Sequence, residues 1–529
     1  MNNNGHIPRK WTSTTLGEIG EWCGGGTPSK ENSSYWADGT MPWVSPKDMK
    51  CLRIQDSEDH ISQLATQETN VKPFSPGTVL IVVRSGILAR TLPVAVCDVP
   101  ATMNQDLKGI KPFDGIDPLY IAYFMIGSER GILHQCCKSG TTVASIEIPR
   151  LKAFPIRLPP TNEQRRIVEK IDELFSELDA GVAALKRIKA NLKRYRAAVL
   201  KAAVVGRLTE EWRAKHPRTE PASKLLERIL AERRKKWGED QLAKFAADDK
   251  EPPKKWREKY VEPAAPDTSE LRELPKGWTW ATVEQVTHFA KYGSSAKTST
   301  DDAGVPVLRM GNIQDGSLDL TDLKYLPKDH DEFPDLLLQE GDLLFNRTNS
   351  AELVGKSAIY HGNPTPCSYA SYLIGLRTVC GCTPELLCYY LNSWCGRAWI
   401  ASVVSQQVGQ ANVNGSKLQA LVFPLPPVPE QTQIIAEVER CFSNIAVAQA
   451  QVDTNLKRAD RLCQSILKRA FEGNLVPQDP TDEPADKLLE RIRQERTATN
   501  GNGVAPRTRR GRVAKQNTPK AKRTESHHE

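Results

Sequence analysis

Apolar residues recur every three or four positions along a segment from about residue 162 to 205. Such alternating steps of four and three form a heptad seam and predict a long amphipathic helix. The stretch Thr161-Asn-Glu-Gln164 predicts a capping box at its start, and Gly206 is placed to end it. Gly181 occupies the one gap in a seam made of Ile167, Ile171, Leu174, Leu178, Leu185, Ile188, Leu192, Tyr195 and Val199.

A second segment repeats this pattern 267 positions later and ends near Gly473. Because both seams have the same register, we predict that the two helices pack as an antiparallel coiled coil, although each could instead pack only on its own globular segment. At ~1.5 Å per residue, Ile167 to Val199 would be a rod of ~48 Å, or about 14 base pairs. The second seam comprises Ile434, Val438, Cys441, Ile445, Ala448, Val452, Asn455, Ala459, Leu462 and Ile466.

Short apolar runs broken by Gly and Pro precede each helix and predict β-rich globular segments. The run Gly77–Val83 is typical of a strand. Composition divides the chain into six segments. The first three are a globular segment (1–160), a long helix (161–206) and a charged connector with a short helix near Leu225–Leu230 (207–272). The last three are a second globular segment (273–427), a second long helix followed by a short one (428–495), and a tail (496–529).

The duplication extends well beyond the helices. Trp11-Thr12 returns as Trp278-Thr279, Glu163-Gln164 as Glu430-Gln431, and the ten residues from Glu220 nearly repeat from Glu483. A period this long indicates a duplicated domain-plus-helix module rather than a solenoid. The halves agree least over 20–150 and 287–415. A shared frame with two different faces suggests a molecule that recognises two different things at a fixed separation.

Composition and charge set outer limits. The 529 residues are 39% hydrophobic and 26% charged, and no 18-residue apolar run exists. The start lacks an apolar signal core, so we expect a cytoplasmic protein. Residues 498–529 hold eight Lys or Arg against two Glu, which is most of the net charge of +8. We predict that this tail is disordered, either as a solvated terminus or as a phosphate-binding arm.

Motifs for chemistry are missing. Gly355-Lys-Ser357 lacks the glycine that a phosphate loop needs at position 350, and no nucleophile or metalloprotease motif occurs. The twelve scattered cysteines favour reduced thiols, and a cluster near His361 fits no zinc template, so we expect no metal site. That cluster contains Cys367, Cys380, Cys382, Cys388 and Cys395. We therefore expect no catalytic residues in this chain.

The two globular segments and their exits match a family. Trp11–Ile19 and Gly277–Val286 resemble the opening of a target-recognition domain, and Pro-Pro followed by Glu-Gln at both exits resembles the family's boundary into its helices. Over about 8–495 the chain resembles specificity subunits of type I restriction–modification systems. The resemblance implies an α+β fold, in which two β-rich target-recognition domains are joined by two long helices forming an antiparallel coiled coil with pseudo-twofold symmetry.

The same resemblance implies a non-catalytic DNA reader with a bipartite target and an unread spacer. Its partners would be double-stranded DNA, two methyltransferase subunits, and restriction and translocase subunits. The partner subunits, not this chain, would use S-adenosylmethionine, ATP and Mg²⁺. Two alternatives remain at this point, an autonomous two-headed DNA-binding regulator and an enzyme.

Base contacts are expected from Arg, Lys and Asn on loops, because Arg pairs with guanine and Asn with adenine. For each candidate a phosphate contact or a solvated charge is an open alternative. The candidates follow or separate strand-like runs, and they are Lys47, Arg84, Arg90, Arg309, Asn312, Arg347, Asn349 and Lys356.

Overall fold

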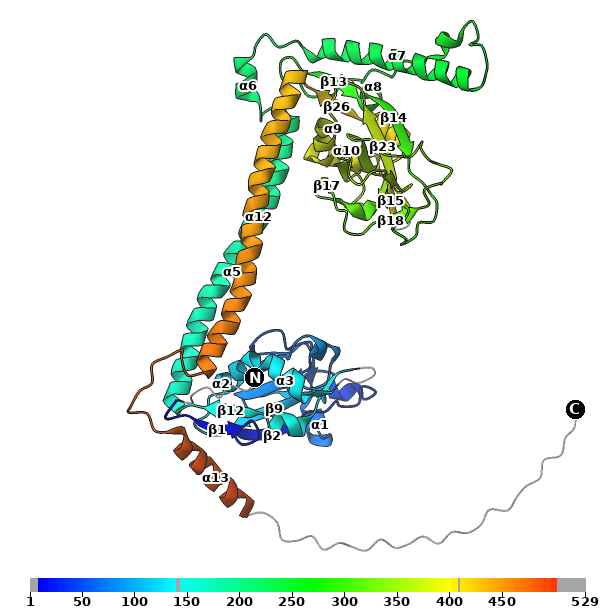
Figure 1. Ribbon diagram of the computed structural model, residues 1–529. Coiled ribbons are helices and arrows are strands. Elements are labelled where there is room, and N and C mark those ends of the chain that lie inside the picture. Colours follow the sequence, from blue (N-terminus) through cyan, green and yellow to red (C-terminus); the bar gives the residue numbers. More distant parts are fainter. Residues whose placement is uncertain (1–7, 139–142, 408–409, 502–529) are drawn as a thin grey trace, which may run out of the picture. The chain divides into compact units, whose positions relative to one another are not determined.

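The computed structural model describes residues 8–138, 143–407 and 410–501, so the basic tail beyond 501 lies outside the described residues. The chain divides into two compact units (Figure 1). Unit 1 comprises residues 1–182 and 457–529, and unit 2 comprises residues 183–456. Each unit therefore contains the start of one long helix and the end of the other, because the helices are α5 (Thr161–Val204) and α12 (Val428–Phe471).

Unit 1 contains a recognition domain built on a five-stranded sheet with the order β2-β9-β6-β7-β4. A three-stranded sheet, β5-β3-β8, and the pair β1-β12 accompany it. The strands are β1 (Thr12–Thr15), β2 (Gly20–Gly24), β3 (Met41–Val44), β4 (Arg53–Ile54), β5 (His60–Ile61), β6 (Thr78–Val82), β7 (Val94–Cys97), β8 (Thr102–Met103), β9 (Leu107–Pro112), β10 (Cys137–Lys138), β11 (Ser145–Ile146) and β12 (Pro155–Leu158). The helices are α1 (Gln63–Glu68), α2 (Pro118–Gly127), α3 (Glu129–Cys136), α4 (Ile148–Lys152) and α13 (Ala485–Gly501).

Unit 2 repeats this topology with the sheets β14-β23-β19-β21, β18-β15-β22 and β13-β26. Its strands are β13 (Thr279–Thr282), β14 (Thr287–Tyr292), β15 (Val305–Leu308), β16 (Ile313–Gln314), β17 (Ser317–Leu318), β18 (Lys324–Leu326), β19 (Leu343–Asn346), β20 (Thr348–Asn349), β21 (Ser357–Ile359), β22 (Ser368–Tyr369), β23 (Leu373–Thr378), β24 (Ser405–Gln407), β25 (Gln410–Asn412) and β26 (Val422–Leu425). Its helices are α6 (Glu210–Lys215), α7 (Ala222–Ala247), α8 (Val283–Val286), α9 (Pro384–Asn392), α10 (Trp394–Val403) and α11 (Gly415–Gln419).

The central strands follow the predicted pattern. β6 is buried at all five positions, as expected for an apolar run covered on both faces, and α2 packs against it. β19 takes the same place in unit 2, antiparallel to β23. Each domain thus has its own hydrophobic core, which also includes the adjoining parts of both long helices.

The long helices pack antiparallel within each unit, as predicted. In unit 1, Ile167 and Ile171 of α5 share a core with Ile466 of α12. In unit 2, Val199 at the other end of α5 shares a core with Ile434 of α12. The start of each helix therefore packs on the end of the other, and the alternative in which each helix packs only on its own domain is wrong.

Burial along the predicted seam is uneven. Ile188 and Leu462 are 46% and 47% exposed, so their assignment to a closed seam is wrong. By the duplication, Ile188 corresponds to the polar Asn455 of the second helix, and Leu462 corresponds to Tyr195, which is itself 53% exposed. Leu174, Leu178, Leu185 and Leu192 are half-buried, and the buried positions are Ile167, Ile171, Val199, Ile434, Val438, Cys441, Ile445, Val452, Ala459 and Ile466.

Both long helices end as predicted, but the first begins differently. Gly206 and Gly473 have φ of +75° and +77°, the left-handed conformation that a glycine adopts most easily. The predicted capping box at Thr161 is wrong. Thr161 Oγ1 donates to the Gly115 carbonyl at 2.8 Å, and Gln164 Oε1 accepts from the Asp117 backbone N–H at 2.9 Å. These side chains tie the helix to its domain instead of capping it.

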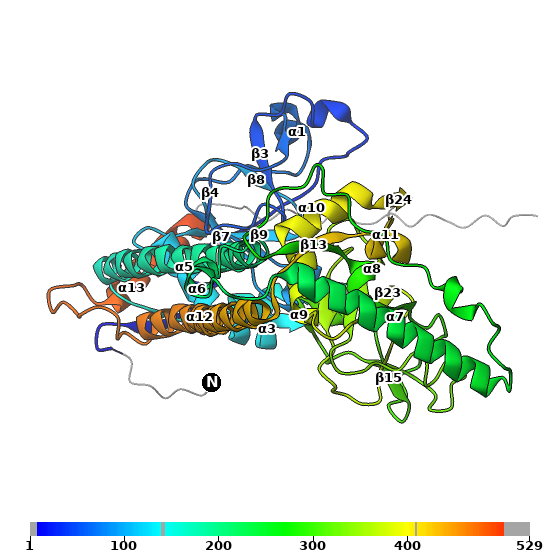
Figure 2. The same ribbon diagram turned by 90° about the horizontal axis from the view of Figure 1, so that it is seen from above.

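The connector is more helical than its sequence suggested, since α7 has 26 residues. Its first turns repeat α13 and bury Leu225 and Ile229, while its later turns lack a continuous apolar stripe. Those later turns are covered by an aromatic cluster in which Trp237 stacks on Trp256 at a centroid distance of 5.8 Å. α7 packs on β13, α8 and β14 of unit 2 (Figures 1 and 2).

A buried glutamate fixes the start of each long helix to the first strand region of its domain. Trp11 Nε1 donates to Glu163 at 3.0 Å, and Trp278 Nε1 donates to Glu430 at 2.9 Å. Glu430 also forms an ion pair with Arg213 at 2.7 Å. Among the described residues Glu163 has no such ion pair, and burial raises its pKa despite the opposing hydrogen bond from Trp11.

Replacing each glutamate by glutamine tests this difference. Glu430→Gln leaves Arg213 without its carboxylate, and we expect unfolding of that unit to become easier by about 2 kcal/mol. Glu163→Gln strands no cation and removes a buried charge, so its effect should lie within about 1 kcal/mol. Differential scanning calorimetry of the full chain measures both. Equal losses would show that the two joints are electrostatically equivalent.

Candidate nucleic-acid interface

Seven of the eight predicted contact residues lie in two loop segments that occupy corresponding places in the two domains, and Asn349 ends the short strand β20 within the second segment. One loop follows β3 in unit 1 and β15 in unit 2, and each of these strands has one antiparallel and one parallel neighbour. The other loop follows β6 and β19, the buried central strands. The eighth residue, Arg347, is the first residue after β19, where the second loop begins. The first loop carries Lys47, Arg309 and Asn312, and the second carries Arg84, Arg90, Asn349 and Lys356.

A short hairpin borders the second loop in both domains. Arg84 forms an isolated antiparallel bridge with Ser145 of β11. In unit 2, Thr348 pairs in the same way with Asn412 of β25. The backbone N–H groups of Ile146 and Val413 then donate to the carbonyls of Val83 and Arg347, at 2.8 and 2.9 Å. The loop and hairpin therefore form one equivalent surface in each domain.

In unit 1 the three candidates differ in availability. Lys47 forms ion pairs with Asp59 at 2.9 Å and Glu58 at 3.2 Å, so its charge is largely compensated. Arg84 has 66% of its side chain exposed and only a 3.9 Å approach to Asp106. Arg90 is exposed at the end of a single 3₁₀ turn, Gly86–Ala89. Arg84 and Arg90 are thus the more available cations.

In unit 2, Asn312 has a structural role. It is only 4% exposed, its Oδ1 accepts from the Arg309 N–H at 2.8 Å, and its Nδ2 donates to the carbonyls of Asp319 and Asp322. Arg309 in turn pairs with Asp322 at 2.8 Å. The prediction that Asn312 contacts bases is wrong, because its hydrogen-bonding groups already shape the loop.

Arg347 is held in place without a carboxylate. Its guanidinium lies 4.6 Å from the centre of the Tyr292 ring, and Nη2 donates to Asn412 Oδ1 at 3.2 Å. The Tyr292 hydroxyl is itself fixed by the Gly415 N–H at 2.8 Å. An arginine positioned by a ring and an amide keeps its positive charge for another partner.

Four candidates of unit 2 border one cavity of about 430 Å³. Arg309 and Asn312 come from the loop after β15, and Asn349 and Lys356 from the loop after β19. Three apolar or aromatic residues that sequence analysis missed complete its rim, namely Met310, Leu353 and Tyr372, which are 38%, 38% and 48% exposed. No periodic pattern marks these loop residues, although an aromatic residue next to basic loops is a usable signal for nucleic-acid contact.

The cysteine cluster of unit 2 is not arranged as a metal site. Burial raises the pKa of Cys367, Cys382 and Cys388 to about 12, which keeps these thiols protonated. Over residues 8–138, 143–407 and 410–501 no three His, Cys, Asp or Glu side chains gather as metal ligands would.

Over the same residues no helix has the length and apolar character needed to span a membrane.

Comparison with known proteins identifies the duplicated frame. The family model of the type I restriction modification DNA specificity domain matches twice, at residues 8–190 and 275–457. The chain belongs to this family. Each match starts at a proline, Pro8 or Pro275, three residues before the tryptophan that precedes the first strand of the domain, and it ends within a long helix. The protein is thus a DNA sequence specificity subunit, as the resemblance implied.

Two specificity subunits of Escherichia coli show the extent of the similarity. The EcoKI specificity subunit is 27% identical over 94% of this chain and 98% of its own length. The EcoR124I/EcoR124II specificity subunit is 44% identical, but over 34% of this chain and 45% of its own length. The match to the EcoR124I/EcoR124II subunit is thus shorter but has the higher identity, as expected if some segments of the chain have diverged less than others.

Solved structures share the fold. A chain from a study titled as the structural basis of complex assembly and conformational transition of the type I restriction–modification system aligns over 89% of this chain with a TM-score of 0.58 and 18% identity. The HsdS subunit from Thermoanaerobacter tengcongensis aligns over 89% with a TM-score of 0.50 and 18% identity. At such identities the likeness confirms the two-domain, two-helix fold alone.

Substitution by alanine should have different effects at Lys356, which borders the cavity of unit 2, and at Asn312, whose side chain bonds within its own loop. Lys356→Ala should leave the melting temperature unchanged, weaken DNA binding several-fold, and reduce the salt dependence of log K by about one phosphate equivalent. Asn312→Ala should instead lower stability by about 2 kcal/mol, because three backbone groups of the loop lose their hydrogen-bond partner. Fluorescence anisotropy at several salt concentrations and thermal denaturation distinguish them. A destabilised Lys356→Ala with an unchanged salt slope would contradict the assignment.

Proposed function

We propose that this specificity subunit recognises a bipartite DNA target, with one half-site read by each recognition domain and an unread spacer between them. The observation that carries the proposal is the pair of corresponding loops, which have the same frame but different side chains in the two domains. Unit 1 offers Arg84 and Arg90, whereas unit 2 offers Arg347, Asn349 and Lys356. Two frames that differ at the contact positions are suited to two different base sequences.

The paired helices are proposed to set the length of the spacer. α5 starts against the first domain, where Glu163 binds Trp11, and it ends where Gly206 packs near Trp278 of the second domain. α12 runs in the reverse sense, from Glu430 and Trp278 to Gly473 beside Trp11. Because each helix is fixed to one domain at its start and to the other at its end, its length is a natural determinant of half-site separation.

Two methyltransferase subunits are proposed to bind this chain, one for each pseudo-equivalent surface. Tyr195 and Leu462 occupy equivalent positions of α5 and α12, and both are about half exposed at places where a closed seam would bury them. Exposed apolar residues on a helix favour contact with another protein. Restriction and translocase subunits would complete the assembly in the cytoplasm. In this proposal S-adenosylmethionine, ATP and Mg²⁺ act on the partner subunits, and this chain contributes no catalytic group.

Exchange of one domain tests the division between half-sites. Replacing residues 20–150 by the corresponding segment of a relative with another target should change one half-site and leave the other half-site and the spacer unaltered. Each domain has its own core and its own loops, which is why the effects should separate. Methylation-site sequencing of cells carrying the exchange reads out the target. A change in both half-sites would overturn the proposed independence.

Charge introduced at the two exposed apolar positions tests the stoichiometry. Native mass spectrometry should detect two methyltransferase subunits on the wild-type chain, one on Tyr195→Asp or Leu462→Asp, and none or weakly bound subunits on the double variant. Gln451→Asp on the exposed side of α12 is the matched control and should bind two. A wild-type chain that saturates with one subunit would refute the pseudo-twofold assembly.

A further inference from the structure

The two halves differ in charge at a turn that leads into α7 and α13. His216-Pro-Arg-Thr219 precedes α7, and Asp479-Pro-Thr-Asp482 precedes α13. Both turns are closed by the same backbone hydrogen bond, from residue four to residue one, at 3.3 Å. Each is followed by an equivalent ion pair, Glu220–Arg228 in unit 2 and Glu483–Arg491 in unit 1. The backbone is therefore duplicated here, while the side chains change sign.

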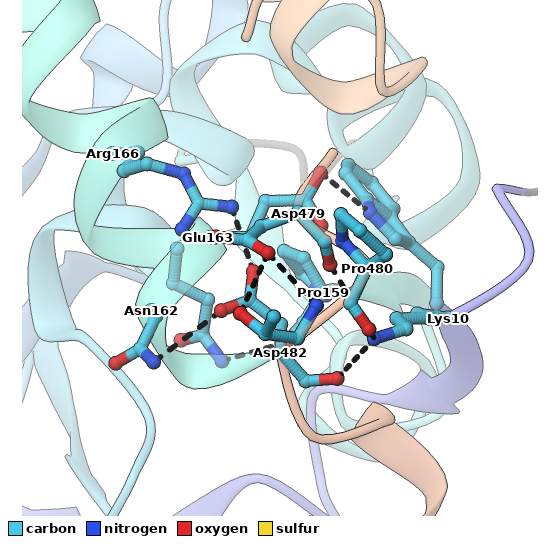
Figure 3. Close-up of polar contacts among 11 residues, drawn as sticks. Lys10, Pro159, Asn162, Glu163, Arg166, Asp479, Pro480 and Asp482 are labelled. Carbon is cyan, nitrogen blue, oxygen red and sulfur yellow. Dashed lines mark hydrogen bonds and ion pairs between the residues drawn. The ribbon is translucent and has the colours of Figure 1, made fainter. Parts of the chain in front are cut away.

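In unit 1 the acidic turn is compensated within the chain (Figure 3). Asp482, only 5% exposed, accepts from Arg166 Nη2 at 2.7 Å and from Asn162 Nδ2 at 3.3 Å. Lys10 Nζ donates to the carbonyls of Asp479, Pro480 and Asp482. Buried carboxylates require such partners, so this turn is complete as it stands.

In unit 2 the corresponding turn carries positively charged side chains. The positions of unit 2 that correspond to the compensating residues of unit 1 hold uncharged residues. Gly277 stands in the place of Lys10 and Gln433 in the place of Arg166. Lys215 and Arg218 are exposed, and neither forms an ion pair with any residue of the part of the chain that the structure describes. The turn of unit 2 is therefore basic, and the two positions that hold Lys10 and Arg166 in unit 1 carry no acidic side chain that could compensate it.

A cavity of about 600 Å³ opens beside this basic turn. Lys215, His216 and Arg218 line it together with Leu225 of α7 and with Val428 and Pro429 of α12, and the Glu220–Arg228 ion pair also borders it. The ring of Trp212 stacks on His216 at a centroid distance of 4.2 Å and holds the turn in place. The site thus combines a cationic rim with an apolar wall.

We propose that an acidic segment of one methyltransferase subunit docks in this cavity, a proposal that rests on the function proposed above. Carboxylates would face Lys215 and Arg218, and an apolar side chain would cover Leu225 and Val428. A protein segment fits better than a DNA backbone, because a concave site with apolar walls admits a side chain, whereas duplex phosphates bind protruding cations and bury little apolar surface. Charge complementarity across the rim would also accelerate association.

The two methyltransferase subunits should therefore bind unequally, although the frame is pseudo-symmetric. The subunit on unit 2 would gain the basic turn, while the subunit on unit 1 meets a turn already neutralised by Lys10 and Arg166. Binding of one subunit should weaken steeply with salt, and binding of the other should be nearly insensitive to it.

Charge reversal in the full chain tests the proposal. With purified methyltransferase subunit from the same locus, Lys215→Glu/Arg218→Glu should weaken one of two binding steps by about tenfold and leave the other step and DNA affinity unchanged. Lys244→Glu/Lys254→Glu makes the same change in charge at exposed positions of the connector and should bind as wild type. Hexaglutamate peptide should compete with the sensitive step in the wild-type chain only. The milder Lys215→Ala/Arg218→Ala should give a smaller loss in the same step, which separates docking from misfolding.

Three results would overturn the docking site. If both binding steps are unaltered in Lys215→Glu/Arg218→Glu and in Lys215→Ala/Arg218→Ala, the basic turn contacts no methyltransferase subunit. A loss of DNA affinity with unaltered subunit binding would assign the turn to phosphate contact. A wild-type chain that binds no methyltransferase subunit at all would instead refute the proposed function, and the docking site with it.

Discussion

The buried contact between a glutamate and a tryptophan indole, made once in each unit, is the constraint on which the architecture depends. Glu163 with Trp11, and Glu430 with Trp278, fix the first turn of a long helix to the edge of its own domain. The same tryptophans lie beside Gly473 and Gly206, the glycines that end the opposite helices. One residue therefore organises two helix ends, and a chain built this way must return its second helix antiparallel to its first.

The duplicated frame has diverged mainly in electrostatics. Arg213 compensates Glu430, whereas Glu163 keeps a raised pKa beside Trp11. The turn before α13 is acidic and internally satisfied, while the turn before α7 is basic and open. Backbone geometry, which depends on apolar burial and on glycine conformation, tolerates such exchanges because each changes only a local charge balance. A specificity subunit can thus keep one scaffold and alter what each half binds.

Periodicity predicted the features that depend on long repetitive patterns, namely the two helices, their common register, the glycines at their ends and the buried strand over 78–82. It failed where a side chain chooses between local and tertiary partners. Thr161 and Gln164 suit a capping box, yet they bond to the loop at Gly115 and Asp117. Asn312 has the chemistry of a base-reading residue but is used to close its own loop. The cavity rim at Tyr372 and the length of α7 depend on contacts between distant segments, which no spacing rule encodes.

The central claim, that the helix pair determines half-site separation, is tested most directly by lengthening both helices. Four residues inserted after Gly181 and four after its counterpart Ala448 add ~6 Å to each helix, or one to two base pairs of rise. The residual helical rotation of about 40° is close to the ~35° twist of one base pair. Methylation-site sequencing should then show unchanged half-sites around a spacer longer by one or two base pairs, while four residues inserted at Pro263–Pro266 of the connector should leave the spacer unchanged. Retained methylation at the original spacing after the helix insertions would contradict the account.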